Sequence, residues 1–255
     1  MRIAVLADIH GNLPALRAVL AECDAQSVEA IVVGGDAVAG PMPRDVLETL
    51  AARPEPVHWI SGNAERETVA AFDGAEPAPG PPGRAAAWSA QALDRPWRDA
   101  LASWPIRLEL GGVCFCHGSP RRDDEILTRA TPDDVLREAL AGVEQRLVIG
   151  GHTHQQMLRE PGGGPAYANA GSVGMPYEGR AGAFWAIVDG GEVDLRSTAY
   201  DLDAALAQLR ATGYPDVDDL VAEALVRPVD PDWVTAFFEH GVGRGPDPGP
   251  QPAAP

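Results

Sequence analysis

Histidine and carboxylate side chains recur along this chain in short motifs that also contain glycine. In chain order the motifs are Asp8-Ile9-His10, Gly35-Asp36, Gly62-Asn63-Ala64-Glu65, His117-Gly118 and Gly151-His152-Thr153-His154. A histidine beside glycine at the end of a strand projects into a crevice, where a metal ion can reach its ring nitrogen. Because core packing does not explain polar motifs dispersed over so much of the chain, the pattern predicts that they converge on one metal site.

Two of these motifs have an alternating spacing. One residue separates Asp8 from His10, and one separates His152 from His154. Side chains alternate with a period of two in extended backbone, so each pair is expected to point to one side and hold one cation. A mixed set of imidazole and carboxylate ligands suits Mn, Fe, Zn or Ni, whereas Mg and Ca prefer oxygen alone. Among these metals we expect Mn to be the most effective in vitro.

Two ions in such a site could cooperate in hydrolysing a phosphate ester. Ions roughly 3.5–4 Å apart share a carboxylate, activate a bridging water and clamp a phosphoryl group for in-line attack. Asp36 is the candidate bridge, because one carboxylate can give an oxygen to each ion. The chain has a formal charge of −17, but two divalent cations bring about +4 against −2 from Asp8 and Asp36 and −1 from a hydroxide. The site stays locally positive, and remote charge is screened beyond a Debye length of ~8 Å.

The first half of the chain alternates apolar runs with segments of helical periodicity. We predict buried strands at residues 3–7, 30–33 and 57–60, with helices at 13–22 and 45–52 between them. This order predicts parallel strands with right-handed crossovers and ligands at the carboxyl ends of the strands. Asp8, Asp36 and Asn63 each follow a predicted strand, so we expect all three to point into one crevice.

The second half is richer in strands. We predict strands at 107–110, 113–116, 146–149, 155–159, 166–169, 183–188 and 192–198, helices at 132–141, 202–211 and 217–225, and hairpin turns at Gly111-Gly112 and Gly190-Gly191. Residues 74–104 begin rich in proline and glycine and continue as a helical excursion over the rim of the first sheet. We expect a single domain over residues 1–240, with two sheets face to face and helices outside, and a disordered tail at 241–255.

Composition excludes several kinds of chemistry and partner. All 20 basic residues are arginine, which rules out a lysine nucleophile, a Schiff base and a Walker-type phosphate loop. Three cysteines (Cys23, Cys114 and Cys116) do not form a disulfide framework, and we expect them to pack in the core. The negative net charge of the chain argues against nucleic acid or an anionic membrane as a general partner. No apolar run approaches the ~18–20 residues of a membrane span, so we expect a cytoplasmic protein.

The order of the motifs resembles that of the calcineurin-like metallophosphoesterases over roughly residues 1–200. Asn169-Ala170-Gly171-Ser172-Val173-Gly174 is similar to the N-P-G-S-V-G segment that follows in that family, with alanine in place of proline. The resemblance implies a four-layer α/β/β/α sandwich of two mixed sheets flanked by helices. It also implies the metal ligands: Asp8, His10, Asp36 and His154 for the first ion, and Asp36, Asn63, His117 and His152 for the second. Asn63 would also touch the phosphate, so Asp36 and Asn63 are the candidate catalytic residues.

One position departs from the family pattern. Many members carry a histidine after the Gly-Asn pair, where it protonates or orients the leaving group, but this chain has Ala64. General acid catalysis is worth about 10²–10⁴-fold, so we expect slow hydrolysis of poor leaving groups or a restriction to diesters and activated esters. Small single-domain bacterial and archaeal phosphodiesterases of the family also lack this histidine, and the chain is most similar to them. Glu65 either keeps the support role it has beside that histidine or is a carboxylate at a helix N-terminus.

Arg121 and Arg122 have two interpretations as well. They could bind a substrate phosphate in a bidentate manner, or form a solvated pair beside Asp123 and Asp124.

The leading functional hypothesis is hydrolysis of a small soluble phosphodiester by a metal-bridged hydroxide in a dinuclear site. The alternatives are a phosphomonoesterase or protein phosphatase, and a non-catalytic metal-binding scaffold of the same fold. The sequence leaves the substrate, the native metal pair and the oligomeric state open.

Overall fold

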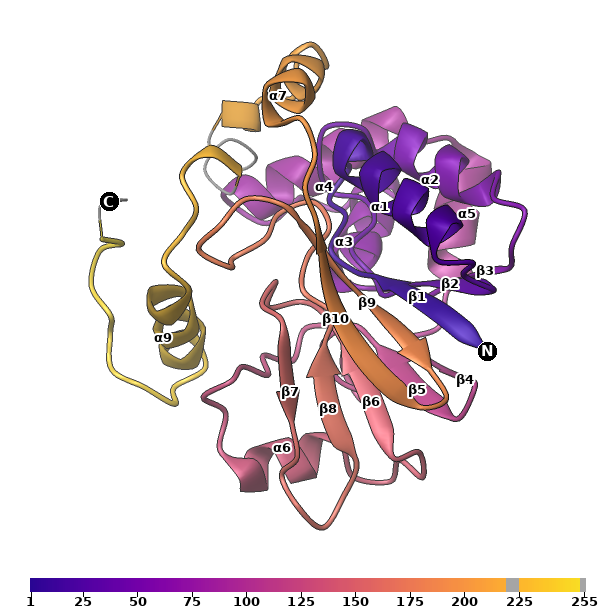
Figure 1. Ribbon diagram of the computed structural model, residues 1–255. Coiled ribbons are helices and arrows are strands. Elements are labelled where there is room, and N and C mark those ends of the chain that lie inside the picture. The colour runs from indigo at the N-terminus through magenta and orange to yellow at the C-terminus, as the bar shows by residue number, and fades with distance from the viewer. Residues whose placement is uncertain (219–224, 253–255) are drawn as a thin grey trace.

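Two five-stranded sheets lie face to face in the computed structural model, which describes residues 1–218 and 225–252 (Figure 1). In spatial order, the first sheet contains β10 (Glu192–Thr198), β9 (Ala183–Asp189), β1 (Arg2–Leu6), β2 (Ala30–Val33) and β3 (Val57–Trp59). The second contains β4 (Arg107–Leu110), β5 (Val113–Cys116), β6 (Leu147–Gly150), β8 (Ala166–Asn169) and β7 (Met157–Arg159). Each sheet has both parallel and antiparallel pairs, so the prediction of two mixed sheets is confirmed.

The three N-terminal strands run parallel, so their carboxyl ends meet at one edge of the first sheet. Ala4 of β1 lies opposite Ile31 of β2, and α1 (Leu13–Ala25) and α2 (Pro43–Ala51) make the predicted connections. On its other side, β1 pairs with β9 in antiparallel orientation. The C-terminal half of the chain thus completes the N-terminal sheet, a pairing that the sequence pattern did not predict.

Both predicted hairpin turns are present. Gly111 and Gly112 connect the antiparallel strands β4 and β5 with φ angles of 59° and 80°. Gly190 and Gly191 connect β9 and β10 with φ angles of 60° and 87°. A two-residue turn with two successive positive φ angles matches the right-handed twist of the strands it joins, and glycine adopts it without steric cost.

Side chains on the central strands divide between three cores. Val5 of β1 and Phe115 of β5 lie in the core between the sheets, whereas Leu6 packs beneath α1 and α2. Cys114 faces the other way, toward α6 (Asp133–Ala139). All three cysteines are buried and unpaired, as expected. The layers are therefore helix, sheet, sheet and helix, which confirms the α/β/β/α sandwich.

Three further helices follow β3. α4 (Pro81–Ala92) and α5 (Arg95–Ser103) occupy the predicted excursion at 74–104 and pack against α3 (Asn63–Phe72). The sequence pattern gave no bounds for α3, although one interpretation of Glu65 placed it at a helix N-terminus. Glu65 stands three residues after Gly62, the spacing of a capping box, and this signal marks where the helix begins.

The C-terminal segment adds α7 (Leu202–Arg210) and α9 (Pro231–Gly241), the second of which was missed. Asp230 caps α9 directly before a proline, a recognisable start signal. Most of the helix predicted at 217–225 lies outside the described residues. Residues 242–252, within the predicted tail, form no helix or strand, and Arg244 there pairs with Glu239. Among the described residues, no helix is long and apolar enough to cross a membrane.

Candidate metal centre

The loops that follow β1 and β2 are joined by backbone hydrogen bonds. The Asp8 N–H donates to the Gly35 carbonyl at 3.0 Å, and the His10 N–H donates to the Asp36 carbonyl at 2.9 Å. Asn63 begins α3 four residues after β3 ends at Trp59. His117 and the His152–His154 segment follow β5 and β6 of the second sheet. The edge where these strands end is therefore lined by all the predicted metal ligands.

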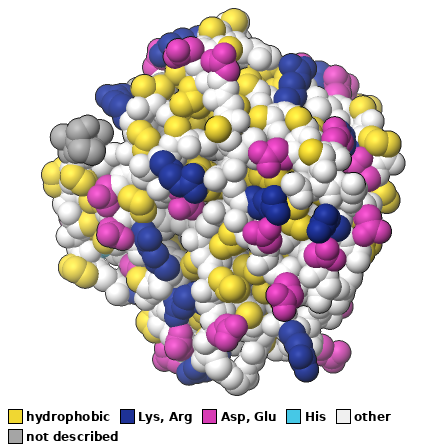
Figure 2. All heavy atoms as spheres, viewed as in Figure 1, with side chains coloured by type: hydrophobic (Ala, Val, Ile, Leu, Met, Phe, Trp, Pro, Cys, Tyr) yellow, Lys and Arg dark blue, Asp and Glu magenta, His cyan; other side chains and the backbone are white. Residues whose placement is uncertain are grey.

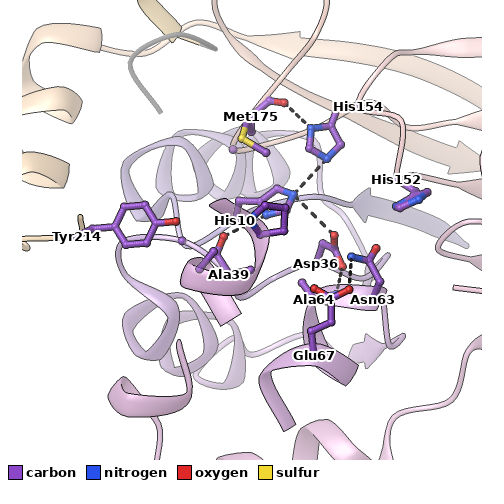
Figure 3. A pocket seen from close by; sticks show the side chains of 14 residues that line it. His10, Asp36, Ala39, Asn63, Ala64, Glu67, His152, His154, Met175 and Tyr214 are labelled. Atoms are coloured by element: carbon purple, nitrogen blue, oxygen red, sulfur yellow. Dashed lines mark hydrogen bonds and ion pairs between the residues drawn. The ribbon is translucent and has the colours of Figure 1, made fainter. Parts of the chain in front are cut away.

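Six of the predicted ligands form two groups, and within each group the candidate ligand atoms lie within 4.8 Å of one another. One group is Asp8, His10 and His154, and the other is Asp36, His117 and His152. Asp36 Oδ2 lies 3.4 Å from His117 Nε2 in its own group and 3.8 Å from His10 Nε2 in the other. Figure 3 shows His10, Asp36 and His154 turned toward one another, so the two groups form one continuous site.

The division between the groups differs from the one expected from strand alternation. His152 and His154 were expected to hold one cation together, but they belong to different groups. Both residues lie beyond the end of β6, where the backbone turns, so the period of two in a strand does not apply to them. The division agrees instead with the ligand sets implied by the family resemblance.

Three of the histidines use Nδ1 for a backbone carbonyl and direct Nε2 into the site. The contacts are His117 Nδ1 to Gly34 O at 2.8 Å, His154 Nδ1 to Met175 O at 2.7 Å, and His10 Nδ1 to Ala39 O at 3.3 Å. A carbonyl oxygen only accepts, so Nδ1 carries a proton in each ring and Nε2 is left as the potential ligand atom. Metal-binding histidines have this arrangement, because the outer partner fixes the tautomer and the ring orientation.

Buried atoms without partners support binding of cations here. Among the described residues, His117 Nε2 and Asn63 Oδ1 are buried and make no hydrogen bond. An unsatisfied buried polar group costs about 1–3 kcal/mol. His10 Nε2 and His154 Nε2 lie 3.2 Å apart, and two lone pairs at that distance need a proton or a metal ion beside them. The residues present therefore fit divalent metal ions.

Without metal, the negative charges of Asp8 and Asp36 are partly offset by His117. Burial opposes protonation of His117, but Asp36 and Asp8 outweigh it and raise the pKa of the imidazole to about 10. Burial raises the pKa of Asp36, but the nearby histidines outweigh it and hold that pKa well below its usual range. Burial and His117 lower the pKa of His152 to about 4. In the metal-free protein a proton on His117 therefore supplies positive charge that a bound cation would supply instead.

Five of the ligands lie in turns with left-handed backbone. Their φ angles are 54° for Asp8, 47° for His10, 53° for Asp36, 69° for His152 and 57° for His154. Aspartate and histidine enter this region more often than most residues, yet it costs of order 1–3 kcal/mol for each non-glycine residue. The fold holds these turns in place through the hydrogen bonds between loops, and backbone strain of this kind clusters at functional sites.

Two glycines allow the loops to approach the ligand carboxylates. A Cβ atom at Gly62 would lie 2.2 Å from Asp36 Oδ1, and one at Gly151 would lie 2.5 Å from Asp8 Oδ2. Neither distance is sterically possible without a shift of the carboxylate. The glycines in these motifs therefore leave room for the ligands themselves, in addition to the open crevice that the sequence suggested.

Glu65 organises the loop that carries Asp36. Its buried carboxylate accepts backbone N–H bonds from Asp36 and Gly62 at 2.8 Å, from Ala37 at 2.9 Å and from Val38 at 3.3 Å. Burial and the nearby Asp36 carboxylate raise the pKa of Glu65 to about 7, while the N–H donors favour the ionised form. Of the two open interpretations, the structure supports the helix N-terminal carboxylate, which here also fixes the loop after β2.

The segment at residues 169–174 makes hydrogen bonds to the loops that carry the metal ligands. The Ser172 hydroxyl donates to the Asp8 carbonyl at 2.7 Å, and the Gly174 N–H donates to the same oxygen at 3.0 Å. The Asn169 side chain donates to Thr153 Oγ1 at 3.0 Å, between the two histidines of the last motif. The polar side chains of this segment thus have a structural role, and none of them is among the predicted metal ligands.

A pocket opens beside the metal ligands. Its lining includes His10, Asp36, Asn63, His152 and His154 together with Glu67, a carboxylate that the sequence analysis missed (Figure 3). Glu67 Oε1 accepts a hydrogen bond of 3.4 Å from Asn63 Nδ2. Its position one helical turn after Asn63 was the available signal, because residues four apart share one face of a helix.

Arg121 and Arg122 do not line this pocket. Arg121 is exposed and pairs with Glu125 and Glu138, and Arg122 is exposed and pairs with Asp124. Of their two interpretations, the structure supports the solvated pair. Figure 2 shows the same pattern on one face of the molecule, where arginine and acidic side chains are interspersed.

Comparison with known proteins agrees with this geometry. Residues 1–190 match the calcineurin-like phosphoesterase superfamily domain, and the chain belongs to that superfamily of metal-binding phosphoesterases. The crystal structure of a metallophosphoesterase from Sphaerobacter thermophilus is similar, with a TM-score of 0.68 and 26% identity over 88% of this chain and 100% of that chain. The crystal structure of hypothetical protein PH1004 from Pyrococcus horikoshii OT3 has a TM-score of 0.75 and 21% identity, over 88% of this chain and 97% of that chain. No curated protein matches the sequence.

Proposed function

We propose that this chain is a dinuclear metal-dependent phosphodiesterase acting on a small phosphate diester. The position of Asp36 Oδ2 carries the proposal, because this oxygen lies within 4 Å of a histidine Nε2 from each ligand group. Asp36 Oδ1 accepts the Ala64 N–H at 2.8 Å and is engaged by the backbone. Asp36 would therefore help to hold both ions, and Oδ2 is the oxygen that the backbone leaves free for this role.

The remaining ligands divide between the two ions. Asp8, His10 and His154 complete the first site, and Asn63, His117 and His152 complete the second. Asn63 Oδ1 is the atom available for the metal, since Nδ2 donates to Glu67. That Nδ2 group lies at the pocket, where it donates to a phosphoryl oxygen of the bound substrate in our proposal.

When bound, two divalent ions lower the pKa of a water molecule and neutralise charge on the phosphoryl group. The protein holds its ligands in place before substrate arrives: Glu65 fixes the Asp36 loop, and backbone carbonyls fix three histidine rings. The mixed imidazole, amide and carboxylate set fits Mn, Fe, Zn or Ni, and we expect Mn to support activity in vitro.

Preference for a diester follows from two residues at the pocket. Ala64 lines it and cannot donate a proton to a leaving group. Glu67 lines it as well, and a carboxylate there repels the second negative charge of a phosphomonoester more than the single charge of a diester. Activity is thus expected to favour diesters with good leaving groups.

The test is hydrolysis of bis-p-nitrophenyl phosphate and of p-nitrophenyl phosphate by Mn-loaded protein. We expect a higher kcat/KM for the diester, and we expect His117→Ala to abolish both activities. His240→Ala changes an exposed histidine on α9, so it is the matched control and should leave both activities unchanged. Full activity after chelation would contradict the mechanism. Two bound ions without turnover on a broad ester panel would instead favour a metal-binding scaffold.

A further inference from the structure

The pocket beside the metal ligands continues into an apolar compartment. Ala39, Ala64, Ala85, Met175 and Tyr214 line this part, and the whole pocket, including the part beside the metal ligands, measures about 170 Å³. An apolar cavity of ~150 Å³ in a protein core is large enough to hold benzene. The pocket as a whole therefore has room for a group about the size of one aromatic ring, and its apolar side chains lie next to the proposed phosphate site.

One polar atom stands among these apolar side chains. The Tyr214 side chain is only 2% exposed, and its hydroxyl is buried without a hydrogen-bond partner among the described residues. Figure 3 shows the hydroxyl on the side of the ring that faces His10. Burial raises the pKa of Tyr214 above its usual range, so the hydroxyl stays protonated and can donate as well as accept. Buried polar groups in folded proteins nearly always have partners, so the unpaired hydroxyl of this pocket-lining tyrosine points to a partner atom on a ligand.

The tyrosine is held in place by α4. Its ring packs edge-on against Trp88, with centroids 5.6 Å apart and an interplanar angle of 77°. Two residues further along, Asp216 forms a bidentate ion pair with Arg84, in which Nε and Nη2 each lie 2.8 Å from a carboxylate oxygen. Tyr214 lies beyond residues 1–190, which match the family domain, so this wall of the pocket comes from a segment outside that domain. The compartment therefore lies between α4 and the metal ligands, which are both within the family domain, and a C-terminal segment outside it.

We propose that this compartment is a subsite for the organic group of the substrate, which carries a flat, ring-sized apolar moiety with one hydrogen-bonding atom that pairs with the Tyr214 hydroxyl. The inference rests on the proposed function, because the phosphoryl group must bind at the metal ligands for the organic group to enter here. It narrows the substrate class from small diesters in general to diesters with an aromatic or similarly flat group.

Binding of phosphonate monoesters to the Mn-loaded protein tests the subsite separately from catalysis. The probes are the monomethyl esters of methylphosphonic, phenylphosphonic and 4-hydroxyphenylphosphonic acid, each with the single charge of a diester. Calorimetry should give an affinity about tenfold or more higher for the phenyl than for the methyl compound, from burial of the ring. Equal affinities for these two compounds would overturn the subsite.

Two variants address the walls of the compartment. Ala85→Leu fills it, so the ratio of phenyl to methyl affinity should fall toward one. Ala87→Leu, on the same helix but outside the lining, is the matched control and should keep the wild-type ratio. Tyr214→Phe removes only the hydroxyl, so it should weaken binding of the hydroxyphenyl compound by about 3- to 10-fold and leave the phenyl compound unaffected. An unchanged hydroxyphenyl affinity in Tyr214→Phe would overturn the role of the hydroxyl, even if Ala85→Leu fails to fold.

Failure of the subsite and failure of the function are distinguishable. If wild-type protein hydrolyses bis-p-nitrophenyl phosphate and binds the methyl compound but shows no preference for the ring, only the subsite is wrong. If it binds no metal or hydrolyses no diester, the proposed function is wrong and the subsite falls with it.

Discussion

His10 and His154 are 144 residues apart in the sequence, and their Nε2 atoms lie 3.2 Å apart. Each ring is oriented by a backbone carbonyl at its Nδ1 atom, so neither can turn its Nε2 lone pair away without losing that bond. Asp8 Oδ1 lies 3.2 Å from His154 Nε2 on the same side. Three potential metal-ligand atoms, from loops of both sheets, therefore converge on one point. A cation bound there would connect the two sheets.

The first prediction concerns metal stoichiometry. We expect wild-type protein dialysed against Mn to retain two ions and His154→Gln to retain one, because that variant loses a ligand of only one group. Elemental analysis of the dialysed protein measures this. Each lost site also removes its stabilisation, about 2.7 kcal/mol when the metal is at 100 times its Kd. His240→Gln, away from the site, should keep two ions, and two ions in His154→Gln would contradict the assignment.

Glu65→Gln should destabilise the protein strongly. The glutamate oxygens accept N–H bonds from four residues, two at each oxygen. A glutamine amide would place its NH₂ group against two of those donors in either orientation. We expect unfolding in denaturant to show a loss of about 2–5 kcal/mol. Glu67→Gln, on the same helix and with one hydrogen bond to a side chain, should lose less than about 1 kcal/mol; equal losses would show that the Glu65 contacts are not responsible.

Gly151→Ala should weaken metal binding through Asp8. The added Cβ would lie 2.5 Å from Asp8 Oδ2 and 2.8 Å from the Ala7 side chain, so the carboxylate must move. We expect a stability cost of about 1–3 kcal/mol, together with a clear loss of Mn affinity in calorimetry. Gly164→Ala is the matched control, since nothing lies within 4 Å of a Cβ there. A wild-type Mn affinity in Gly151→Ala would show that the close contact between residue 151 and Asp8 does not limit metal binding.

Leaving-group dependence tests the consequence of Ala64. Without a proton donor at the leaving oxygen, kcat should fall steeply from p-nitrophenyl to phenyl diesters. Ala64→His adds a donor, and we expect it to raise kcat for the phenyl diester by about tenfold or more while changing the p-nitrophenyl rate much less. Ala64→Asn adds bulk and a hydrogen-bond donor but no group that can give up its proton, so it controls for steric and hydrogen-bonding effects. An equal rise for both esters would argue against general acid catalysis.

The acid stability of the metal-free protein should depend on Glu239. Burial raises the pKa of this carboxyl, but hydrogen bonds from Arg244, Thr128 and Thr131 outweigh it and leave the pKa below its ordinary value. The group therefore adds stability that is present above the unfolded pKa and is lost as the pH falls through the lower folded pKa. Glu239→Gln should cost about 1–3 kcal/mol near neutrality, with the difference from wild type shrinking in acid.

Denaturant unfolding across this pH range measures the effect. Glu138→Gln is the control, because Glu138 is an exposed partner of Arg121 and should change stability little at any pH. A Glu239→Gln difference that stays constant from neutral pH into acid would contradict the linkage.

The family, the layers and most of the strands could be predicted from the sequence. Strands such as Val113–Cys116 and Ala166–Asn169 were predicted with their observed bounds, because apolar runs between turn residues are a local signal. Asp8, Asp36 and Asn63 were placed at strand ends by the β-α-β order alone, since parallel strands leave the ligands at one edge. α9 was missed and α3 was left without bounds although capping residues mark both helices, because capping is a weaker signal than an apolar pattern.

The use of these side chains could not be predicted, because it depends on contacts between distant parts of the chain. His152 and His154 separate into different groups because each lies in a left-handed turn, where strand alternation does not set the direction of a side chain. Glu65 holds the loop after β2 in place because four backbone N–H groups from two loops donate hydrogen bonds to its carboxylate. Tyr214 reached the pocket through contacts with α4, more than 120 residues earlier in the chain. Such roles depend on which distant segments meet, and a local pattern carries no information about that.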